Sequence, residues 1–275
     1  MGQVNFVVAE IRGEIVRSGG MFCDAHAHLT CDSVFPLLPE VLERARSARI
    51  DTIVNICTDE PSLRRGIALR EDVKQIYNVG ATTPHDVAER GEADFATFER
   101  MAREGKSVAI GETGLDYHHT LSPKELQKHF LIRYLRLAVE VDLPVVIHCR
   151  EAFDDLFALT EEHYPDRPLM LHCFTGTADE AKRALERGWY LSFSGIVTFK
   201  KSVALRETAR SAPLERMVIE TDTPYLAPEG KRGKSNEPSF LVRVAEELAT
   251  VKGLSLEEVA TVTSRNAKMF FRIVD

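Results

Sequence analysis

Met21-Phe22-Cys23-Asp24-Ala25-His26-Ala27-His28-Leu29 is the stretch from which the fold can be worked out. Its apolar start predicts a first β-strand, and its end carries two histidines. Because side chains alternate between the faces of a strand, His26 and His28 point the same way, about 6–7 Å apart along an extended chain. Two neutral imidazoles that converge in this way can hold a divalent cation. A His-x-His pair is also common among exposed or hydrogen-bonded histidines. Whether this pair belongs to a metal site therefore depends on the residues at the other strand ends.

Short apolar runs alternate with longer amphipathic stretches from Met21 onward. Strands are expected at Met21–Asp24, Thr52–Cys57, Ile76–Gly80, Ser107–Glu112, Pro144–His148, Leu169–His172, Trp189–Phe193 and Met217–Thr221. Helices are expected at Pro39–Ala48, Ser62–Asp72, Asp94–Glu104, Ser122–Val141, Phe153–His163, Ala178–Arg187, Val203–Ala212, Ser239–Val251 and from Ser255 onward. Capping boxes are predicted where Ser122 precedes Glu125 and where Ser255 precedes Glu258.

Strand–helix alternation indicates a parallel sheet. Eight such repeats within 275 residues predict an α/β protein with a single-domain (β/α)8 TIM barrel. A doubly wound open sheet is the alternative architecture. It is disfavoured because no Gly-x-Gly-x-x-Gly follows the first strand.

Composition limits the classes of function. The formal net charge of −7 excludes the global basic field of a passive nucleic-acid coat, but not a nuclease that handles phosphate with cations and local arginines. The five cysteines lack CxxC spacing, which predicts a reduced, cytoplasmic chain. No run reaches the length of a membrane span, so no membrane partner is expected, and no obligate protein partner is inferred.

The first 20 residues are expected to be an N-terminal extension of unknown role that precedes the barrel of residues 21–275. Glu10, Arg12 and Glu14 interrupt the apolar run before a secretory core could form, so no signal peptide is predicted. The extension is either a leader or an accessory strand or hairpin over Phe6–Val16.

The active site of such a barrel lies at the carboxyl ends of its strands, so metal ligands should occur there. Five predicted strands deliver a histidine or a carboxylate at that end, whereas the strand beginnings carry none. These residues are His26, His28, Glu112, His148, His172 and Asp222. A metal site explains this arrangement better than scattered structural polar residues do.

Six ligands exceed one open tetrahedral site but suit two cations that share a bridging ligand. Glu112 is the expected bridge, because a carboxylate can span cations about 3.5–4 Å apart. We expect one ion on His26, His28 and Asp222, and the other on His148 and His172. Asp222 is the expected general base for water activated by the pair. Glu220, one layer deeper, is expected to orient a ligand, with a role at a third cation as the alternative.

These strand ends resemble, in order, the motifs of the TatD family of metal-dependent deoxyribonucleases. The motifs are Asp24-x-His26-x-His28-Leu29, Gly111-Glu112-x-Gly114-Leu115-Asp116-Tyr117, His148-Cys149-Arg150-x-Ala152, His172-Cys173-Phe174-x-Gly176, Glu220-Thr221-Asp222-x-Pro224-Tyr225-Leu226 and Arg232-Gly233-Lys234-x-Asn236-Glu237-Pro238. The resemblance implies an amidohydrolase-like TIM barrel of the metal-dependent hydrolase type, with two or three divalent cations, Mg²⁺ or Mn²⁺. The histidine ligands would also accept Zn²⁺. The resemblance also implies cleavage of DNA, commonly from the 3′ end. The family's metal positions fall on the six residues derived above.

One motif departs from the family. The third strand of the family ends in Gly-x-His-Pro-His, but here Gly80-Ala81-Thr82-Thr83-Pro84-His85 places Thr83 where a histidine is expected. His85 remains. If the missing histidine normally touches the substrate phosphate or the activated water, this protein should be slower or altered in specificity, with its metal ligands intact.

Residues that bind substrate are expected beside the metal ligands. Arg150 can clamp a phosphate with two hydrogen bonds, and Arg232 belongs to a short basic loop, although such loops are more often merely solvated. His85 completes the expected set. The aromatic residues at the strand ends could stack on a base or belong to the core. They are Phe174, Phe193, Phe199 and Tyr225.

Three functions follow from the sequence. The first is a hydrolase that cleaves phosphodiester bonds of DNA, of the 3′-to-5′ exonuclease type, on single-stranded DNA or 3′ ends. The second is a hydrolase of small molecules or of aminoacyl esters and amides on the same binuclear barrel. The third, a non-catalytic metal-stabilised scaffold, is least consistent with an intact ligand set and a general base.

Overall fold

The computed structural model describes residues 22–274, and the predicted N-terminal extension lies outside this range. Eight strands form one parallel sheet in sequence order. They are β1 (Phe22–Ala27), β2 (Ile50–Cys57), β3 (Ile76–Gly80), β4 (Ile110–Asp116), β5 (Val145–Arg150), β6 (Leu169–Leu171), β7 (Tyr190–Phe193) and β8 (Met217–Ile219). A parallel bridge between Ala27 and Thr223 brings the two edges together, so the sheet is a nearly closed barrel.

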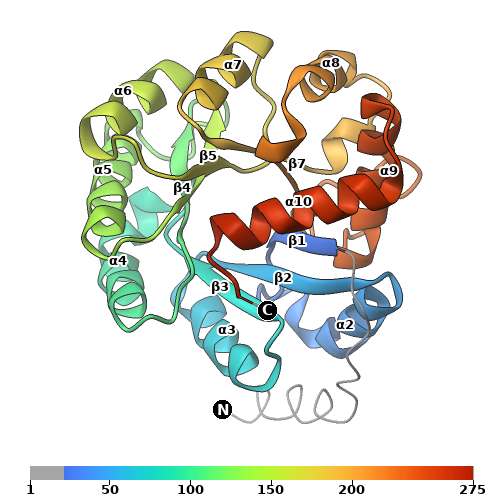
Figure 1. Cartoon of the computed structure of the whole chain (residues 1–275). Coiled ribbons are helices and arrows are strands. Elements are labelled where there is room, and N and C mark those ends of the chain that lie inside the picture. The colour runs from blue at the N-terminus through green and yellow to red at the C-terminus, as the bar shows by residue number, and fades with distance from the viewer. Residues whose placement is uncertain (1–21, 275) are drawn as a thin grey trace.

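The helices follow the strands and surround the barrel (Figure 1). They are α2 (Leu38–Ser47), α3 (Glu60–Asp72), α4 (Val87–Arg103), α5 (Lys124–Glu140), α6 (Phe153–His163), α7 (Ala178–Glu186), α8 (Val203–Ser211), α9 (Leu241–Lys252) and α10 (Leu256–Phe270). Short 3₁₀ helices lie at η1 (Phe35–Leu37), η2 (Gly195–Thr198), η3 (Leu214–Arg216) and η4 (Pro238–Phe240). The predicted single-domain (β/α)8 barrel is therefore confirmed.

The core has two parts, as expected when a sheet is closed on itself and covered by helices. The larger part packs the helices on the outer face of the sheet. The smaller part fills the barrel with residues such as Val54, Val146 and Val218, and it includes Phe270 and Phe271 of α10. Figure 1 shows α10 crossing one end of the barrel. Because α10 closes the end where the strands begin, the opposite end is free for a site.

Asp24 joins the first and last strands of the barrel. Its buried carboxylate accepts hydrogen bonds from the backbone N–H of Thr221 (2.9 Å) and from the Thr221 hydroxyl (2.6 Å). Two backbone bonds continue the seam, from His28 N to Thr223 O (2.8 Å) and from Asp222 N to His26 O (2.9 Å). The seam therefore fixes His26 and His28 against Asp222.

Some predicted boundaries were wrong. α4 begins at Val87 rather than Asp94, because Val87 and Gly91 extend its buried face. A Cβ at Gly91 would lie 2.5 Å from the Phe130 ring, so glycine permits close packing there rather than ending the helix. The Ser255–Glu258 capping box is confirmed. The one predicted at Ser122 is wrong, since the Ser122 hydroxyl does not cap α5: it donates to the carbonyl oxygen of His85 (2.8 Å) and accepts the backbone N–H of Ala88 (3.1 Å) in the first turn of α4.

Gly114 is a position where β4 and β5 approach too closely for a side chain. Its φ is +145°, and a Cβ would lie 1.9 Å from the carbonyl oxygen of His148. Gly114→Ala should therefore cost more than about 3 kcal/mol of unfolding free energy, through strain and overpacking. Urea denaturation of the metal-free protein measures this loss. Gly105→Ala is the control, because Gly105 also has a positive φ (+67°) but open space around it. It should lose only about 1 kcal/mol, and similar losses for the two variants would contradict the packing argument.

Candidate metal centre

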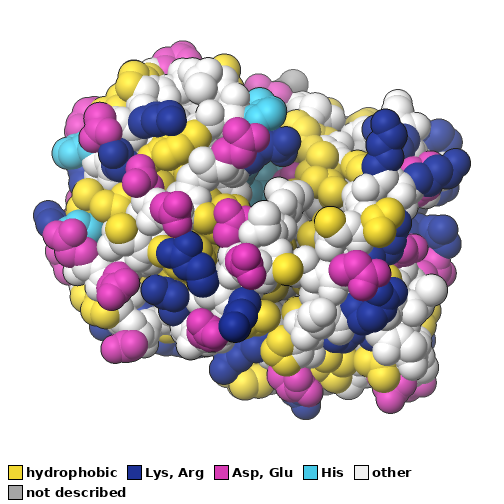
Figure 2. Space-filling view, turned by 90° about the horizontal axis from the view of Figure 1, so that it is seen from above, with side chains coloured by type: hydrophobic (Ala, Val, Ile, Leu, Met, Phe, Trp, Pro, Cys, Tyr) yellow, Lys and Arg dark blue, Asp and Glu magenta, His cyan; other side chains and the backbone are white. Residues whose placement is uncertain are grey.

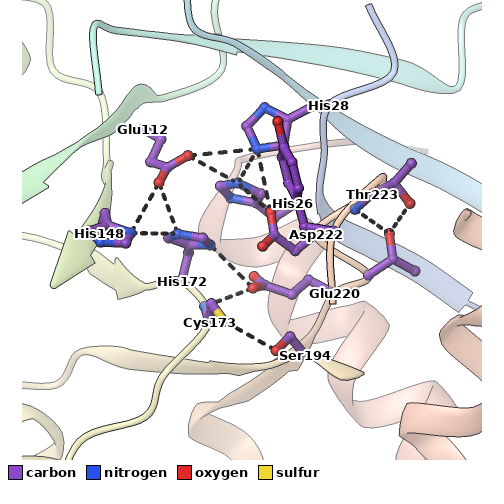
Figure 3. Close-up of polar contacts among 12 residues, drawn as sticks. His26, His28, Glu112, His148, His172, Cys173, Ser194, Glu220, Asp222 and Thr223 are labelled. Carbon is purple, nitrogen blue, oxygen red and sulfur yellow. Dashed lines mark hydrogen bonds and ion pairs between the residues drawn. The ribbon is translucent and has the colours of Figure 1, made fainter. Parts of the chain in front are cut away.

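The six predicted ligands converge at the carboxyl ends of the strands (Figure 3). His26 and Glu112 lie within β1 and β4, and His148 lies in β5. His28 and His172 follow β1 and β6 directly, and Asp222 lies in the segment after β8. Their side chains are buried, except that of His148, which is 17 % exposed. The rings of His26 and His172 stack with their centroids 4.0 Å apart. Residues from five strands are thus brought to one mouth of the barrel.

Glu112 lies between two pairs of histidines. Its Oε1 is 3.2 Å from His148 Nδ1 and 3.0 Å from His172 Nε2. Its Oε2 is 3.5 Å from His26 Nε2 and 3.7 Å from His28 Nε2. Each carboxylate oxygen therefore faces one pair, which is the arrangement that a bridging carboxylate requires.

Asp222 lies within 4 Å of both histidines of one pair. Its Oδ1 lies 3.7 Å from His26 Nε2 and 3.4 Å from His28 Nε2. The half of the site on β1 and β8 thus offers His26, His28 and Asp222, and the other half offers His148 and His172. The division of the ligands between two cations stays a prediction, since ligand atoms of His26, His172 and Asp222 also lie within 4.8 Å of one another.

The donor atoms fit divalent cations. His26 Nε2 and His28 Nε2 are 3.3 Å apart, and so are His148 Nδ1 and His172 Nε2. A neutral imidazole has a lone pair on one nitrogen, and two lone pairs directed at each other repel unless a proton or a cation lies between them. Within each of these groups the ligand atoms lie within 4.8 Å of one another: His26, His28 and Glu112; His26, His172 and Asp222; Glu112, His148 and His172. Nitrogen and carboxylate donors in this number suit Zn²⁺ or Mn²⁺.

In the metal-free site, the carboxylates and the histidines shift one another's pKa values. Burial disfavours the charged form of Glu112, but His172, His148 and His26 outweigh it and hold the pKa of Glu112 well below its usual value. Burial likewise opposes charge on His172, yet Glu112 and Glu220 raise the pKa of His172 well above its usual value. Glu112 and His172 thus favour each other's charged forms, and a bound cation would take the place of the proton that this pairing favours on His172.

Glu220 has the contacts of a residue that orients a ligand, as the sequence suggested. Its Oε1 lies 3.2 Å from His172 Nδ1 and accepts the backbone N–H of Cys173 at 2.7 Å. The hydroxyl of Ser192 donates to Oε2 at 2.5 Å. His172 is therefore held from behind while its Nε2 faces Glu112.

Asp116 is a site residue that the sequence reasoning missed. Its buried carboxylate lies behind His148, with Oδ2 2.9 Å from His148 Nε2. The same oxygen contacts His85 and also His119. A signal was present, because Asp116 follows Glu112 by four residues and strand alternation returns it to the same face.

Irregular pairing occurs in both strands that carry central ligands. The register of β1 with β2 shifts between Asp24 and Ala27, and that of β4 with β5 shifts between Ile110 and Thr113. Such bulges change the direction of side chains and are frequent next to active sites. His26 and Glu112 lie inside these two irregular segments.

The predicted substrate residues lie around the mouth at different distances from its centre. His85 Nε2 is 2.8 Å from Asp116, and its ring lies 5.1 Å from that of His148. Arg150 follows His148 by two residues on β5, so alternation places both on one face. Arg232 lies with its guanidinium 4.5 Å from the centre of the Phe199 ring. The hydroxyl of Thr83 donates to Asp86 at 2.9 Å, so this departure from the family lies beside the start of α4.

Two of the four aromatic residues considered for stacking belong to the core. Phe174 and Phe193 are buried. Tyr225 is 57 % exposed, and its ring lies 5.8 Å from that of His28. Of the four, Tyr225 is therefore placed to meet a substrate beside the candidate ligands.

Fold and site together define the class: a metal-dependent hydrolase built on a (β/α)8 barrel. A family model described as TatD related DNase matches residues 23–272. The chain therefore belongs to the TatD family, as its motifs indicated.

Relatives of known name agree with this membership. A Bacillus subtilis protein named as the uncharacterized metal-dependent hydrolase YabD is 40% identical over 254 residues, which cover 92% of this chain and 100% of that protein. The 3′-5′ ssDNA/RNA exonuclease TatD of Pantoea vagans is 34% identical over 241 residues, covering 85% and 93%. The solved structure of the Escherichia coli TatD homologue YJJV has a TM-score of 0.88 and 25% identity, covering 94% of this chain and all of its own. A TatD family hydrolase of Entamoeba histolytica has a TM-score of 0.81 and 26% identity, covering 92% and 98%.

Among residues 22–274, no helix combines the length and the apolar character needed to cross a membrane.

Proposed function

We propose that this protein hydrolyses phosphodiester bonds of DNA at a binuclear metal centre, with single-stranded or 3′ ends as the substrate. The observation that carries the proposal is the position of Glu112, whose two carboxylate oxygens each face one pair of histidines. A single-metal site would not need a carboxylate between two sets of ligands. His26, His28 and Asp222 would hold one cation, and His148 and His172 the other, with Glu112 shared.

The cations, when bound, would polarise the scissile phosphate and lower the pKa of water. The chain's own residues supply the rest. Asp222 would accept the proton of the attacking water, because its carboxylate lies at the mouth beside His28 and 7 % of its surface is exposed. Glu220 and Asp116 would hold His172 and His148 in place from behind.

A nucleic-acid substrate agrees with the residues around the mouth. Arg150 would clamp a phosphate beside the centre. The ring of His85 lies 5.1 Å from that of His148. The exposed ring of Tyr225 would stack on a base. Lys231 and Arg232 lie in the loop after β8, over the rings of Phe240 and Phe199. Figure 2 shows positive and negative side chains mixed over one face of the molecule, with no single basic field across it. The basic groups are local, as expected for an enzyme and not for a nucleic-acid coat.

Removal of metal should abolish the activity. Protein treated with a chelator and then dialysed should not degrade single-stranded DNA, and added Mn²⁺, Mg²⁺ or Zn²⁺ should restore degradation. DNA labelled at its 3′ end should lose the label before DNA labelled at its 5′ end is shortened to small products. RNA, a small phosphodiester, N-acyl amino acids and aminoacyl-tRNA complete the panel. Chelator-sensitive hydrolysis of only the amides or aminoacyl esters would contradict the proposal and select the alternative hydrolase.

A further inference from the structure

One carboxylate oxygen of Asp116 lies within hydrogen-bond distance of three imidazoles beside the metal centre. Its Oδ2 lies 2.9 Å from His148 Nε2, 2.8 Å from His85 Nε2 and 2.8 Å from His119 Nδ1. Its Oδ1 accepts the backbone N–H groups of His118 (2.9 Å) and His119 (2.8 Å). The carboxylate is therefore fixed from both sides, and only one of its contacts reaches a predicted metal ligand.

The contact with His148 determines which ring nitrogen can bind a cation. A carboxylate accepts hydrogen bonds and donates none, so Asp116 keeps the proton of neutral His148 on Nε2. The lone pair is then on Nδ1, which lies 3.2 Å from Glu112 and 3.3 Å from His172 Nε2. Asp116 thus selects the tautomer of His148 that directs a lone pair into the centre.

The two halves of the centre differ in how their histidines are supported. The half with Asp222 has three ligands of its own, yet Nδ1 of its His26 is buried without a hydrogen-bond partner among residues 22–274. The half with His148 and His172 has only two ligands of its own, and a carboxylate lies behind each of them. A carboxylate behind a histidine ligand fixes the ring and makes it a stronger base. The half with fewer ligands is therefore the one with the stronger support.

We propose that Asp116 is a positioning residue that keeps the cation in the half formed by His148 and His172. The role rests on the binuclear centre proposed above and adds a residue to it. Loss of the Asp116 carboxylate should weaken one of two metal sites about 10- to 100-fold, which is the usual effect of losing such support.

Asparagine and alanine at this position separate positioning from a structural role. In Asp116→Asn the amide oxygen should stay on the two backbone N–H groups, because those donors cannot change. The amide NH₂ then faces His148 Nε2, and His148 relieves this conflict by moving its proton to Nδ1, where it blocks the cation. Asp116→Ala leaves Nδ1 able to bind. We therefore expect Asn to weaken the second site at least as much as Ala, although Asn retains the backbone contacts and should melt closer to the wild type.

The experiment is a titration of metal-free protein with Mn²⁺, followed by electron paramagnetic resonance. Wild-type protein should take up two Mn²⁺ per chain and give the spectrum of a spin-coupled pair. Asp116→Asn should keep one tight site and lose the coupled spectrum at Mn²⁺ concentrations that fill the wild type. The matched control is Glu151→Gln, because the Glu151 carboxylate also contacts an imidazole, that of His118 at 2.8 Å, but no predicted ligand. It should behave as the wild type.

The possible failures are distinguishable. If the wild type binds two Mn²⁺ and Asp116→Asn binds both with unchanged affinity, the role of Asp116 is wrong and the binuclear centre stands. A larger loss of the second site in Asp116→Ala than in Asp116→Asn, in step with melting temperature, would show that Asp116 acts only through folding. A wild-type protein that binds a single Mn²⁺ would overturn both this role and the binuclear centre.

Discussion

Glu112→Gln should leave a folded protein that cannot hold two cations side by side, and its rate of DNA hydrolysis should fall about 10³-fold. The reason is that both oxygens of Glu112 are in use, one toward His148 and His172 and the other toward the remaining pair. A glutamine has one acceptor oxygen, and its NH₂ group is a donor that cannot bind a cation. One half of the centre would then lose its bridging ligand.

Two measurements check this expectation. Elemental analysis after dialysis should find fewer than two metal ions per chain in Glu112→Gln, and single-turnover kinetics should show the slower hydrolysis. Glu151→Gln is again the control, since Glu151 lies at the same mouth but contacts only His118. Full metal occupancy with a normal rate in Glu112→Gln would remove Glu112 from its bridging role.

The barrel could be predicted from the sequence because the same pattern, a short apolar run followed by an amphipathic stretch, is repeated along the chain. Each strand is buried by helices on one side and by the barrel interior on the other, so each reads as a short apolar run between amphipathic stretches. Errors in single boundaries, such as the start of α4, do not alter the order of elements. The predicted ligands converge in the structure for the same reason, because parallel strands place all their carboxyl ends at one mouth.

The unpredicted parts depend on contacts between distant segments. The register shifts at His26 and Glu112 arise from the pairing of neighbouring strands, and the period-two reading of a single strand cannot show them. Ser122 fits the pattern of a capping box, yet its hydroxyl bonds to the backbone beside His85 because α4 and α5 pack together. At both places a tertiary contact overrode a local signal.

The substrate is harder to predict from the sequence than the metal ligands are. Ligands have to meet at bonding distance, so their residue types and positions are restricted. Substrate contacts such as those proposed for Arg150 and Arg232 come from longer side chains on strand ends and loops, where several positions can serve. Thr83 stands where the motif of the family is expected to carry a histidine, and its hydroxyl donates to Asp86 at the start of α4.

The loss of Asp222 should be the most informative single change, because this residue is proposed to act both as ligand and as general base. Asp222→Asn retains one oxygen that could still face His26 and His28, but an amide cannot take up the proton of the attacking water. The rate of DNA hydrolysis should fall about 10²- to 10⁴-fold, the usual contribution of general base catalysis, even when the variant is saturated with Mn²⁺.

Saturation with metal separates the two roles. If Asp222 acted only as a ligand, a high concentration of Mn²⁺ would restore both occupancy and rate; if it is also the base, occupancy should recover while the rate stays low. Asp154→Asn is the control, because the Asp154 side chain in the first turn of α6 is 93 % exposed and pairs with Arg183 of α7, so its loss should change neither. A variant Asp222→Asn that is filled with Mn²⁺ and turns over at nearly the wild-type rate would show that the proton leaves the water by another route, and the base would have to be sought among the remaining carboxylates at the mouth.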